Sequence, residues 1–321
     1  MDRELKPMVS AVITAYDRKE MVLRAIASLM ASTYGRIEII YVDGNSRDGS
    51  AEAVASIGAV RVVSDDRRGI TSARNIGASA ARGEILLFLD SDAIVGPTTV
   101  GAVVREFCKL NTAIIGVSLR GMDSPNPILT AGVTLRFPFF VPFERLGTRW
   151  SCPNSRAWVF SVTDACLFIR RSVYDALNGY DEDIYPYGEE GLDLCWRCWN
   201  FGWRVAYVPE MAYHRSTAMN PSIRSKPQIR AAMSYVLANA TLIHIKNGDL
   251  VSLSFLPLNI LKLTLNAIRL HQLQAIPMAA SVVFARLPRF LQGRRAQRIG
   301  RKLGSIEIMK RIASPLNSPG T

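Results

Sequence analysis

The chain has 321 residues, of which 49% are hydrophobic and 21% charged, and this balance excludes a disordered chain, a collagen and a small disulfide scaffold. Its formal net charge is +12, but residues 222–321 contain 15 Lys and Arg against two Asp and Glu, whereas residues 1–221 contain 24 against 25. The length predicts about two domains, or one large domain with an appendage. We therefore expect a near-neutral body followed by a strongly basic C-terminal region.

Features that report on localisation favour the cytoplasm. Residues 1–7 are charged and lack the apolar segment of a secretory signal. The five cysteines are an odd number, which favours reduced thiols, and the lone Cys195-x-x-Cys198 pair lacks the second pair of a zinc site. The longest uncharged stretches, 231–245 and 270–285, fall short of the ~20 apolar residues that cross a bilayer. We expect no membrane span, while contact with a membrane surface stays open.

The first third of the chain alternates between apolar runs and segments with helical periodicity. Strands are predicted at 9–13, 37–42, 60–63 and 85–89, and helices at 19–31, 50–57 and 70–81. This alternation is typical of βαβ units in a doubly wound parallel sheet. Ligands of such sheets bind beyond the carboxyl ends of the strands, so the chemistry is expected just after Ile13, Val42 and Leu89.

The rest of the chain changes character twice. Residues 120–165 are irregular and rich in proline and aromatic residues, and strands at 165–169 and 204–208 then enclose a helix at about 192–201. From residue 228 the pattern is helical and amphipathic, with breaks expected at Pro257, Pro277 and Pro288.

Acidic side chains follow the predicted strands where ligands should bind. Asp90-Ser91-Asp92 comes directly after the apolar strand at 85–89, and Asp43 ends the strand at 37–42, which is expected to be its neighbour. Two carboxylates in this position suit Mg²⁺ or Mn²⁺, which commonly arrives with substrate phosphates, although a pair of solvated turn acids or a helix cap would look the same. Arg74, on the helix predicted at 70–81, is placed to meet the same cleft.

Taken in order, these segments resemble the large family of inverting, GT-A-fold glycosyltransferases that use nucleotide-sugar donors, the "family two" enzymes, and among them non-processive, rhamnosyltransferase-like members. The resemblance covers about residues 8–216. The segments that carry it are 9–18, 42–50, 73–77, 83–92, 179–182 and 188–197, followed by Val208-Pro and His214.

The resemblance implies an α/β GT-A fold, with a nucleotide-sugar-binding half at 1–119, an acceptor half at 120–221 and a helical, basic extension at 222–321. It also implies a divalent cation, Mn²⁺ or Mg²⁺. Asp92 would ligate this cation with Asp90 and His214. The residues that it places around the nucleotide sugar are Thr14, Tyr16, Asp43, Arg74, Asp90 and Ser91.

The catalytic base is expected among Glu189 and Glu190, because inversion by single displacement needs a carboxylate that removes the acceptor's proton. Adjacent like charges in a partly buried cleft raise at least one pKa toward the useful range. The family pattern has one residue between the acidic pair and Asp-Leu, whereas two residues precede Asp193-Leu194 here. Glu190 fits either alignment and is preferred, with Glu189 second. Asp164 and Asp181 are weaker candidates.

Other departures from the family pattern leave the substrate open. Gly44 replaces a common second Asp, and Thr14-Ala15 replaces a common Pro-Thr, so the preferred nucleotide is not defined. The Gln-x-x-Arg-Trp motif of processive synthases is absent, so we expect one sugar per encounter. Alternatives are a polyprenyl-phosphate sugar synthase-like transferase, a catalytically dead homologue that binds nucleotide or lipid, and a nucleic-acid-binding protein.

The C-terminal region combines nine basic residues between 286 and 311 with a preceding apolar stretch at 250–287. This combination is typical of segments that bind anionic membrane surfaces. A solvated helix face would also fit, and nucleic acid is disfavoured because aromatic residues do not alternate with the basic ones. We expect peripheral association with the cytoplasmic membrane and an acceptor that is a lipid-linked saccharide of cell-envelope or glycan biosynthesis.

Overall fold

The parallel strands predicted for the first third of the chain form one half of the central sheet in a computed structural model. This structure describes residues 6–66, 69–122, 128–134, 155–184, 186, 188–215 and 225–314. The elements of this half are β1 (Val9–Ala15), α1 (Lys19–Met30), β2 (Ile37–Asp43), α2 (Ser50–Ala55), β3 (Val60–Ser64), α3 (Ile70–Ala80) and β4 (Ile85–Asp90). All four strands pair in parallel, so the predicted βαβ half is confirmed.

The sheet continues as a mixed sheet in the order β3-β2-β1-β4-β9-β6-β10-β5. The additional elements are β5 (Ala93–Val95), α4 (Thr99–Lys109), β6 (Ile114–Gly121), β7 (Ile128–Thr130), β8 (Ala157–Trp158), β9 (Cys166–Arg170), α5 (Arg171–Ala176), α6 (Glu190–Asn200) and β10 (Val205–His214). Strand β9 runs antiparallel to both β4 and β6, and it joins the two halves. Residues 123–127 and 135–154, which belong to the irregular segment 120–165, lie outside the described residues.

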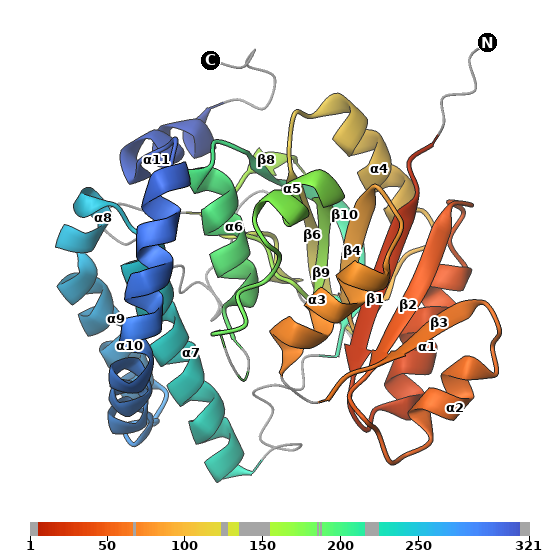
Figure 1. The fold of residues 1–321 in the computed structure, drawn as a ribbon, viewed down its shortest axis with the longest axis horizontal. Coiled ribbons are helices and arrows are strands. Elements are labelled where there is room, and N and C mark those ends of the chain that lie inside the picture. Colours follow the sequence, from red (N-terminus) through yellow and green to blue (C-terminus); the bar gives the residue numbers. More distant parts are fainter. Residues whose placement is uncertain are drawn as a thin grey trace.

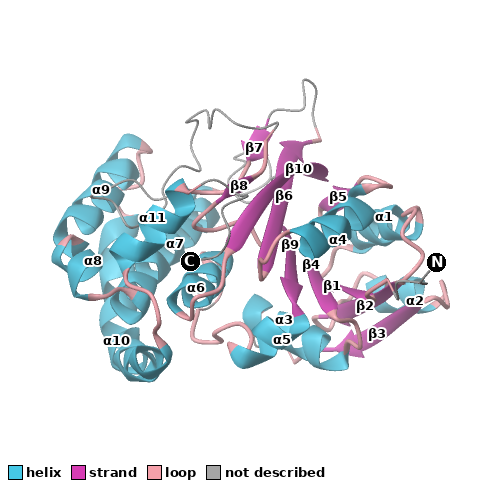
Figure 2. Ribbon diagram, turned by 90° about the horizontal axis from the view of Figure 1, so that it is seen from above, coloured by secondary structure: helices cyan, strands magenta, loops and turns pink. Residues whose placement is uncertain are grey.

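Helices cover both faces of this sheet. Strand β4 shows how, because Leu86 and Phe88 face one core and Leu87 and Leu89 face the other, as the period of two in a strand requires. The first core takes in residues of α3, α5 and α6, and the second takes in residues of α1 and α4 (Figure 2). Burial on both faces explains why the residues of β4 are almost all apolar.

Five helices follow the sheet and pack beside α6 at one end of the molecule (Figure 1). They are α7 (Lys226–Asn247), α8 (Leu250–Ser254), α9 (Leu256–Arg269), α10 (Ala275–Gly300) and α11 (Ser305–Ala313). Helices α7 and α10 lie side by side, and the buried Phe290 and Ile308 join the first core. The C-terminal region therefore shares a core with the sheet and is not a separate tail.

The prolines of the C-terminal region interrupt the helices less than the sequence predicted. Pro257 and Pro277 lie in the first turns of α9 and α10, where the proline nitrogen costs little because no intrahelical partner is available there. Pro288 lies inside α10, and the helix continues through it. The expected break at Pro288 is wrong, because packing of α10 along α7 outweighs the loss of one helical hydrogen bond.

Within the described part of the chain, none of the helices combines the length and apolarity that crossing a bilayer requires.

Candidate active site

Three potential metal ligands meet at the ends of β4 and β10. Strand β10 pairs antiparallel with β5, and this register sets His214 opposite Ala93, next to Asp92. The Nε2 atom of His214 lies 2.9 Å from Oδ1 of Asp92 and 3.7 Å from Oδ2 of Asp90. Each of the three residues offers a ligand atom, and these atoms all lie within 4.8 Å of one another. Residues that are 122 or more positions apart in the sequence are thus assembled by strand pairing.

The donor set of this cluster fits a divalent cation. Two carboxylates and one imidazole are ligands that Mn²⁺ accepts readily, and carboxylates also suit Mg²⁺. Burial lowers the pKa of His214, but hydrogen bonds and charge from Asp90 and Asp92 outweigh it and raise the pKa to about 9. The two carboxylates therefore favour a positive charge on the His214 side of the cluster.

A buried arginine connects this cluster to a second carboxylate. Arg74, which is 3% exposed, donates to Asp90 at 2.8 Å and to Asp164 through its other terminal nitrogen. Burial lowers the pKa of Arg74, but the charges around it, Asp164 first, raise the pKa above its usual value. Helix α3 approaches closely enough to make these contacts because Gly77 has no side chain: a Cβ there would lie 2.3 Å from Val12 Cγ1.

The side chain of Glu190 is buried at the first residue of α6, beside Asp164. A Cβ at Gly191 would lie 3.1 Å from the Val162 carbonyl and 3.3 Å from Asp164 Cβ, so the start of α6 rests directly on this segment. Burial first, and then the charge of Asp164, raise the pKa of Glu190 to about 8. The backbone N–H of Gly188 donates to Oε1 of Glu190.

The turn before Glu190 is conformationally unusual. Gly188 has φ 103° and Glu189 has φ 72°, and a left-handed backbone is disfavoured for a side chain such as that of glutamate. Residues held in this way cluster at functional sites. Glu189 is half-buried at the N-cap of α6, so the two candidate bases have distinct positions: Glu190 is enclosed and Glu189 is at the turn.

The remaining predicted nucleotide-binding residues lie at the ends of β1, β2 and β4. Asp43 is 5% exposed and accepts from the Tyr41 hydroxyl at 2.6 Å and from the Ser46 backbone at 2.9 Å. Thr14 is half-buried on the adjacent β1, and Tyr16, which follows it, is 45% exposed. Ser91 is buried between the two aspartates. Parallel pairing of β1 with β2 and β4 brings these ends to the same edge of the sheet.

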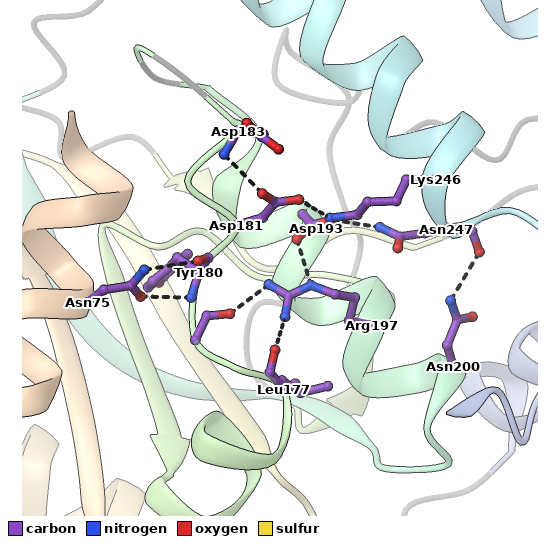
Figure 3. Close-up of polar contacts among 11 residues, drawn as sticks. Asn75, Leu177, Tyr180, Asp181, Asp183, Asp193, Arg197, Asn200, Lys246 and Asn247 are labelled. Carbon is purple, nitrogen blue, oxygen red and sulfur yellow. Dashed lines mark hydrogen bonds and ion pairs between the residues drawn. The ribbon is translucent and has the colours of Figure 1, made fainter. Parts of the chain in front are cut away.

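A buried network behind Glu190 was not recognised in the sequence (Figure 3). Asp193 pairs with Arg197 at 2.7 Å and with Lys246 at 2.6 Å, and Lys246 also pairs with Asp181. Burial raises the pKa of Asp193, but the two cations outweigh it and lower the pKa to about 2. Asp181, a weaker candidate for the base, therefore has a structural partner. The i, i+4 spacing of Asp193 and Arg197 was the signal that could have revealed this pair.

The loop that contains Asp181 is held from the other side by α3. Asn75 donates to the Tyr180 carbonyl at 3.0 Å and accepts from the Tyr180 backbone N–H at 2.9 Å. Figure 3 shows this contact between Asn75 and Tyr180. Asn75 follows Arg74, so successive residues of α3 contact this loop and the carboxylates of Asp90 and Asp164. Cys195 and Cys198 lie buried in α6 with free thiols.

Comparison with known sequences identifies the family. A family profile described as glycosyl transferase family 2 matches residues 10–175, and the chain therefore belongs to this family. The O-antigen biosynthesis protein RfbC of Myxococcus xanthus is 28% identical over 232 residues, which are 66% of this chain and 18% of that protein. The succinoglycan biosynthesis protein ExoO of Rhizobium meliloti is 40% identical over 103 residues, 31% of this chain and 30% of that protein. The chain thus spans less than a third of the length of these relatives.

Solved structures show the same fold. The mannosyltransferase PcManGT from Pyrobaculum calidifontis, in complex with GDP-Man and Mn²⁺, matches with a TM-score of 0.57 and 19% identity over 89% of this chain and 77% of its own. GalNAc-T7 with UDP, GalNAc and Mn²⁺ matches with a TM-score of 0.58 and 18% identity over 77% of this chain and 49% of its own. The fold is GT-A with a helical C-terminal region, as the resemblance implied.

Proposed function

We propose that this chain transfers one sugar from a nucleotide-diphosphate sugar to an acceptor hydroxyl, with inversion at the anomeric carbon. The observation that carries the proposal is that Arg74 connects the three-residue metal cluster to a second carboxylate. Asp90, with Asp92 and His214, lies on one side of Arg74, and Asp164, whose charge acts on Glu190, lies on the other. The side with Asp90 suits binding of the donor diphosphate with its cation. The side with Asp164 and Glu190 suits removal of the proton from the acceptor hydroxyl.

The residues Asp90, Asp92 and His214 would hold the cation, Mn²⁺ or Mg²⁺. When bound, the cation would neutralise the negative charge that develops on the leaving nucleoside diphosphate. Arg18 lies 3.8 Å from Asp92 and adds a cationic side chain at the same edge of the sheet. The Mn²⁺ in the two similar structures supports this assignment.

The strand ends beside this cluster would bind the nucleoside. Asp43 keeps a fixed orientation through Tyr41 and Ser46, and Thr14 and Tyr16 lie on the neighbouring strand and its following turn. Arg74 serves the same site indirectly, since both of its terminal nitrogens are engaged by carboxylates and it orients Asp90.

Glu190 is the proposed general base. A carboxyl with a pKa of about 8 is a stronger base than an ordinary glutamate, and it is partly ionised at neutral pH. The hydrogen bond from Gly188 and the rigid start of α6 fix its direction. Single displacement of this kind needs no covalent intermediate, because the acceptor oxygen attacks as Glu190 takes its proton.

The acceptor is proposed to be a lipid-linked saccharide of cell-envelope or polysaccharide biosynthesis, reached by peripheral association with the cytoplasmic face of a membrane. Two observations support this. Relatives are named for O-antigen and succinoglycan biosynthesis, and residues 222–321 carry a large excess of basic side chains. Transfer of one sugar per encounter follows from the absence of the processive motif.

The proposal is tested by calorimetric titration of nucleoside diphosphates and their sugars with and without Mn²⁺, followed by NMR of the transferred sugar. We expect one nucleotide to bind only with the cation, and the product anomer to be opposite to that of the donor. Retention of the donor configuration would contradict the single displacement. Failure of every nucleotide to bind would favour a catalytically dead homologue.

A further inference from the structure

A cavity of about 260 Å³ lies among the C-terminal helices, far along the chain from the proposed active site. Its lining residues are Asp249, Leu250, Arg294, Arg298 and Arg301. The first two begin α8, and the arginines come from the last part of α10 and the residue after it. None of these residues has a part in the proposed sugar transfer.

Part of the positive charge in this cavity has a structural use. Arg294 donates to the carbonyls of Ile245 and Gly248, and Arg301 donates to that of Asn247, so both arginines bind the C-terminal end of α7. Cations are favoured at this end of a helix. These contacts fix two guanidinium groups at the cavity, and the charge of Asp249 acts on both of them.

Among the residues that the structure describes, Asp249 is the one carboxylate that lines the cavity, and it already accepts hydrogen bonds. Asp249 accepts from the Ser252 backbone at 2.8 Å through Oδ1 and from the Ser305 backbone at 2.7 Å through Oδ2, and Oδ1 also accepts from the Ser305 hydroxyl at 2.8 Å. It therefore caps α8 and α11 at once. Three guanidinium groups against one engaged carboxylate leave the cavity with an excess of positive charge.

Arg298 is an accessible donor in the cavity. The Nε of Arg301 has no hydrogen-bond partner among the described residues, but it is buried and therefore not accessible to a ligand in the cavity. Burial and repulsion from Arg298 lower the pKa of both Arg294 and Arg301. Arg298 is exposed and makes no ion pair within the described part of the chain. A phosphate group fits this arrangement, because its several oxygens can accept from more than one guanidinium fork.

An exposed leucine lines the cavity, and further exposed leucines lie in α9, the helix that follows α8 in the chain. Leu250 lines the cavity and is 81% exposed, and it begins the segment that continues into α9. In α9, Leu263 faces the helices while Leu261 and Leu265 are 52% and 55% exposed. Helices α8 and α9 form the end of the molecule opposite β2 and β3 (Figures 1 and 2). Exposed leucines beside a basic site suit a lipid interface better than a soluble phosphate compound.

We propose that the arginine cavity binds the phosphate of an anionic lipid headgroup, while Leu250 and the exposed leucines of α9 contact the acyl region. This inference rests on the proposed membrane association and is independent of the sugar transfer. It moves the membrane contact from the basic segment 286–321 as a whole to one end of the C-terminal helices. There, the lipid is recognised by a defined site and not by net charge alone.

The test compares two single-charge variants of the full chain, Arg298→Gln and Arg295→Gln. Both arginines are exposed on α10, but only Arg298 lines the cavity. Each variant is sedimented with phosphatidylcholine vesicles that contain or lack phosphatidylglycerol, and its thermal unfolding is compared with that of the unaltered chain. Inorganic phosphate and glycerol 3-phosphate serve as soluble competitors.

We expect Arg298→Gln to weaken binding to the anionic vesicles by about tenfold or more, the effect of losing a hydrogen bond to a charged group. Arg295→Gln should weaken it by no more than about fivefold, as for any basic residue near an anionic surface. Equal losses would overturn the site but keep the membrane association. Failure of the unaltered chain to sediment would overturn both. Full release of the protein from the vesicles by a low concentration of soluble phosphate would assign the cavity to a soluble ligand and overturn the lipid assignment.

Discussion

At the scale of single residues, the ionisation of Glu190 connects the structure to a measurable pH dependence. Its carboxyl is buried and lies near Asp164, and its pKa is about 8. A general base acts only when ionised, so kcat/KM should rise with pH through about 8. Replacement by glutamine removes the base but keeps the shape of the side chain.

We expect Glu190→Gln to lower kcat by about 10² to 10⁴-fold, with nucleotide affinity unchanged, and to abolish the rise of activity with pH. Steady-state kinetics and calorimetry on the same preparation measure both quantities. Glu189→Gln is the matched comparison. If that variant loses the activity and Glu190→Gln keeps it, the base is Glu189.

The same substitution changes the pH dependence of stability. The folded-state pKa of Glu190 is raised from 4.5 to about 8, so above pH 4.5 the folded state retains a proton that the unfolded chain has lost. The free energy of unfolding therefore falls as pH rises through this range. Glu190→Gln should stabilise the protein more above pH 8 than below pH 4.5, which thermal unfolding at the two pH values would show.

Asp92 is the residue on which cation-dependent donor binding should depend most directly. Its carboxylate contacts His214 at 2.9 Å and is 11% exposed, and it belongs to the three-residue cluster. We expect Asp92→Asn to abolish the increase in nucleotide affinity that Mn²⁺ produces, because an amide is a weak ligand without charge. Calorimetry with and without Mn²⁺ measures this. Unchanged cation dependence would place the cation elsewhere.

At the scale of elements, the contact between α3 and β1 determines where Arg74 lies. A Cβ at Gly77 would be 2.3 Å from Val12 Cγ1 and 2.9 Å from Val42 Cγ2, so α3 must move away if alanine is introduced. Overpacking of this kind costs about 1–3 kcal/mol. Gly101 in α4 is the matched control, since its nearest neighbours would lie 3.6 Å or more away.

We expect Gly77→Ala to lower the free energy of unfolding and to weaken nucleotide binding, because the shift of α3 moves Arg74 away from Asp90. Gly101→Ala should be neutral or stabilise the protein by up to about 1 kcal/mol, as alanine favours helix. Urea unfolding and calorimetry measure the two effects. Equal stability of both variants would show that the close contact at Gly77 does not determine how α3 packs on β1.

The elements that could be predicted from sequence are those with local patterns. Short apolar runs identify β1 to β4, of which β1 and β4 are the most completely buried, and helical periodicity identifies the crossovers between them. Asp43 and Asp90-Ser91-Asp92 could be located because strand ends coincide with ligand sites in such sheets. Their positions therefore followed from the order of elements alone.

The contacts that could not be predicted depend on pairing between distant segments. His214 reaches Asp92 only through the pairing of β10 with β5, and Asp164 reaches Arg74 only because β9 runs antiparallel beside β4. No local periodicity encodes these registers. Family resemblance supplied His214, whereas Asp164 was only a weaker candidate for the base and its bond to Arg74 was not foreseen.

At the scale of the whole molecule, the net charge of the C-terminal helices includes arginines that already have partners within the chain. Several of the basic residues in 286–311 make internal contacts and do not form a free basic surface. Arg289 pairs with Asp183 at 3.2 Å, and Arg294 and Arg301 bind the end of α7. Deletion of this segment would also remove the buried Phe290 and Ile308, so point variants are the better test of membrane association.

The network around Lys246 joins these helices to the part of the molecule that holds Glu190. Lys246, in α7, pairs with Asp193 in α6 and with Asp181 in the loop before α6, and its ammonium lies 5.8 Å from the centre of the Phe290 ring in α10. Its side chain is 4% exposed. Removal of one partner from a buried ion network leaves an uncompensated charge, which costs about 3–5 kcal/mol.

We expect Lys246→Met to lower the free energy of unfolding by about this amount, because methionine can fill the space but cannot neutralise Asp181. Lys109→Met is the matched control: Lys109 is 57% exposed, and its partner Glu106 keeps a second ion pair with Arg156, so its loss should cost at most about 1 kcal/mol. Urea unfolding followed by tryptophan fluorescence measures both. Because the network spans α6 and α7, the unaltered chain should unfold in a single transition. Equal midpoints for the two variants, or an early separate loss of the C-terminal helices in the unaltered chain, would show that the network does not couple the two parts.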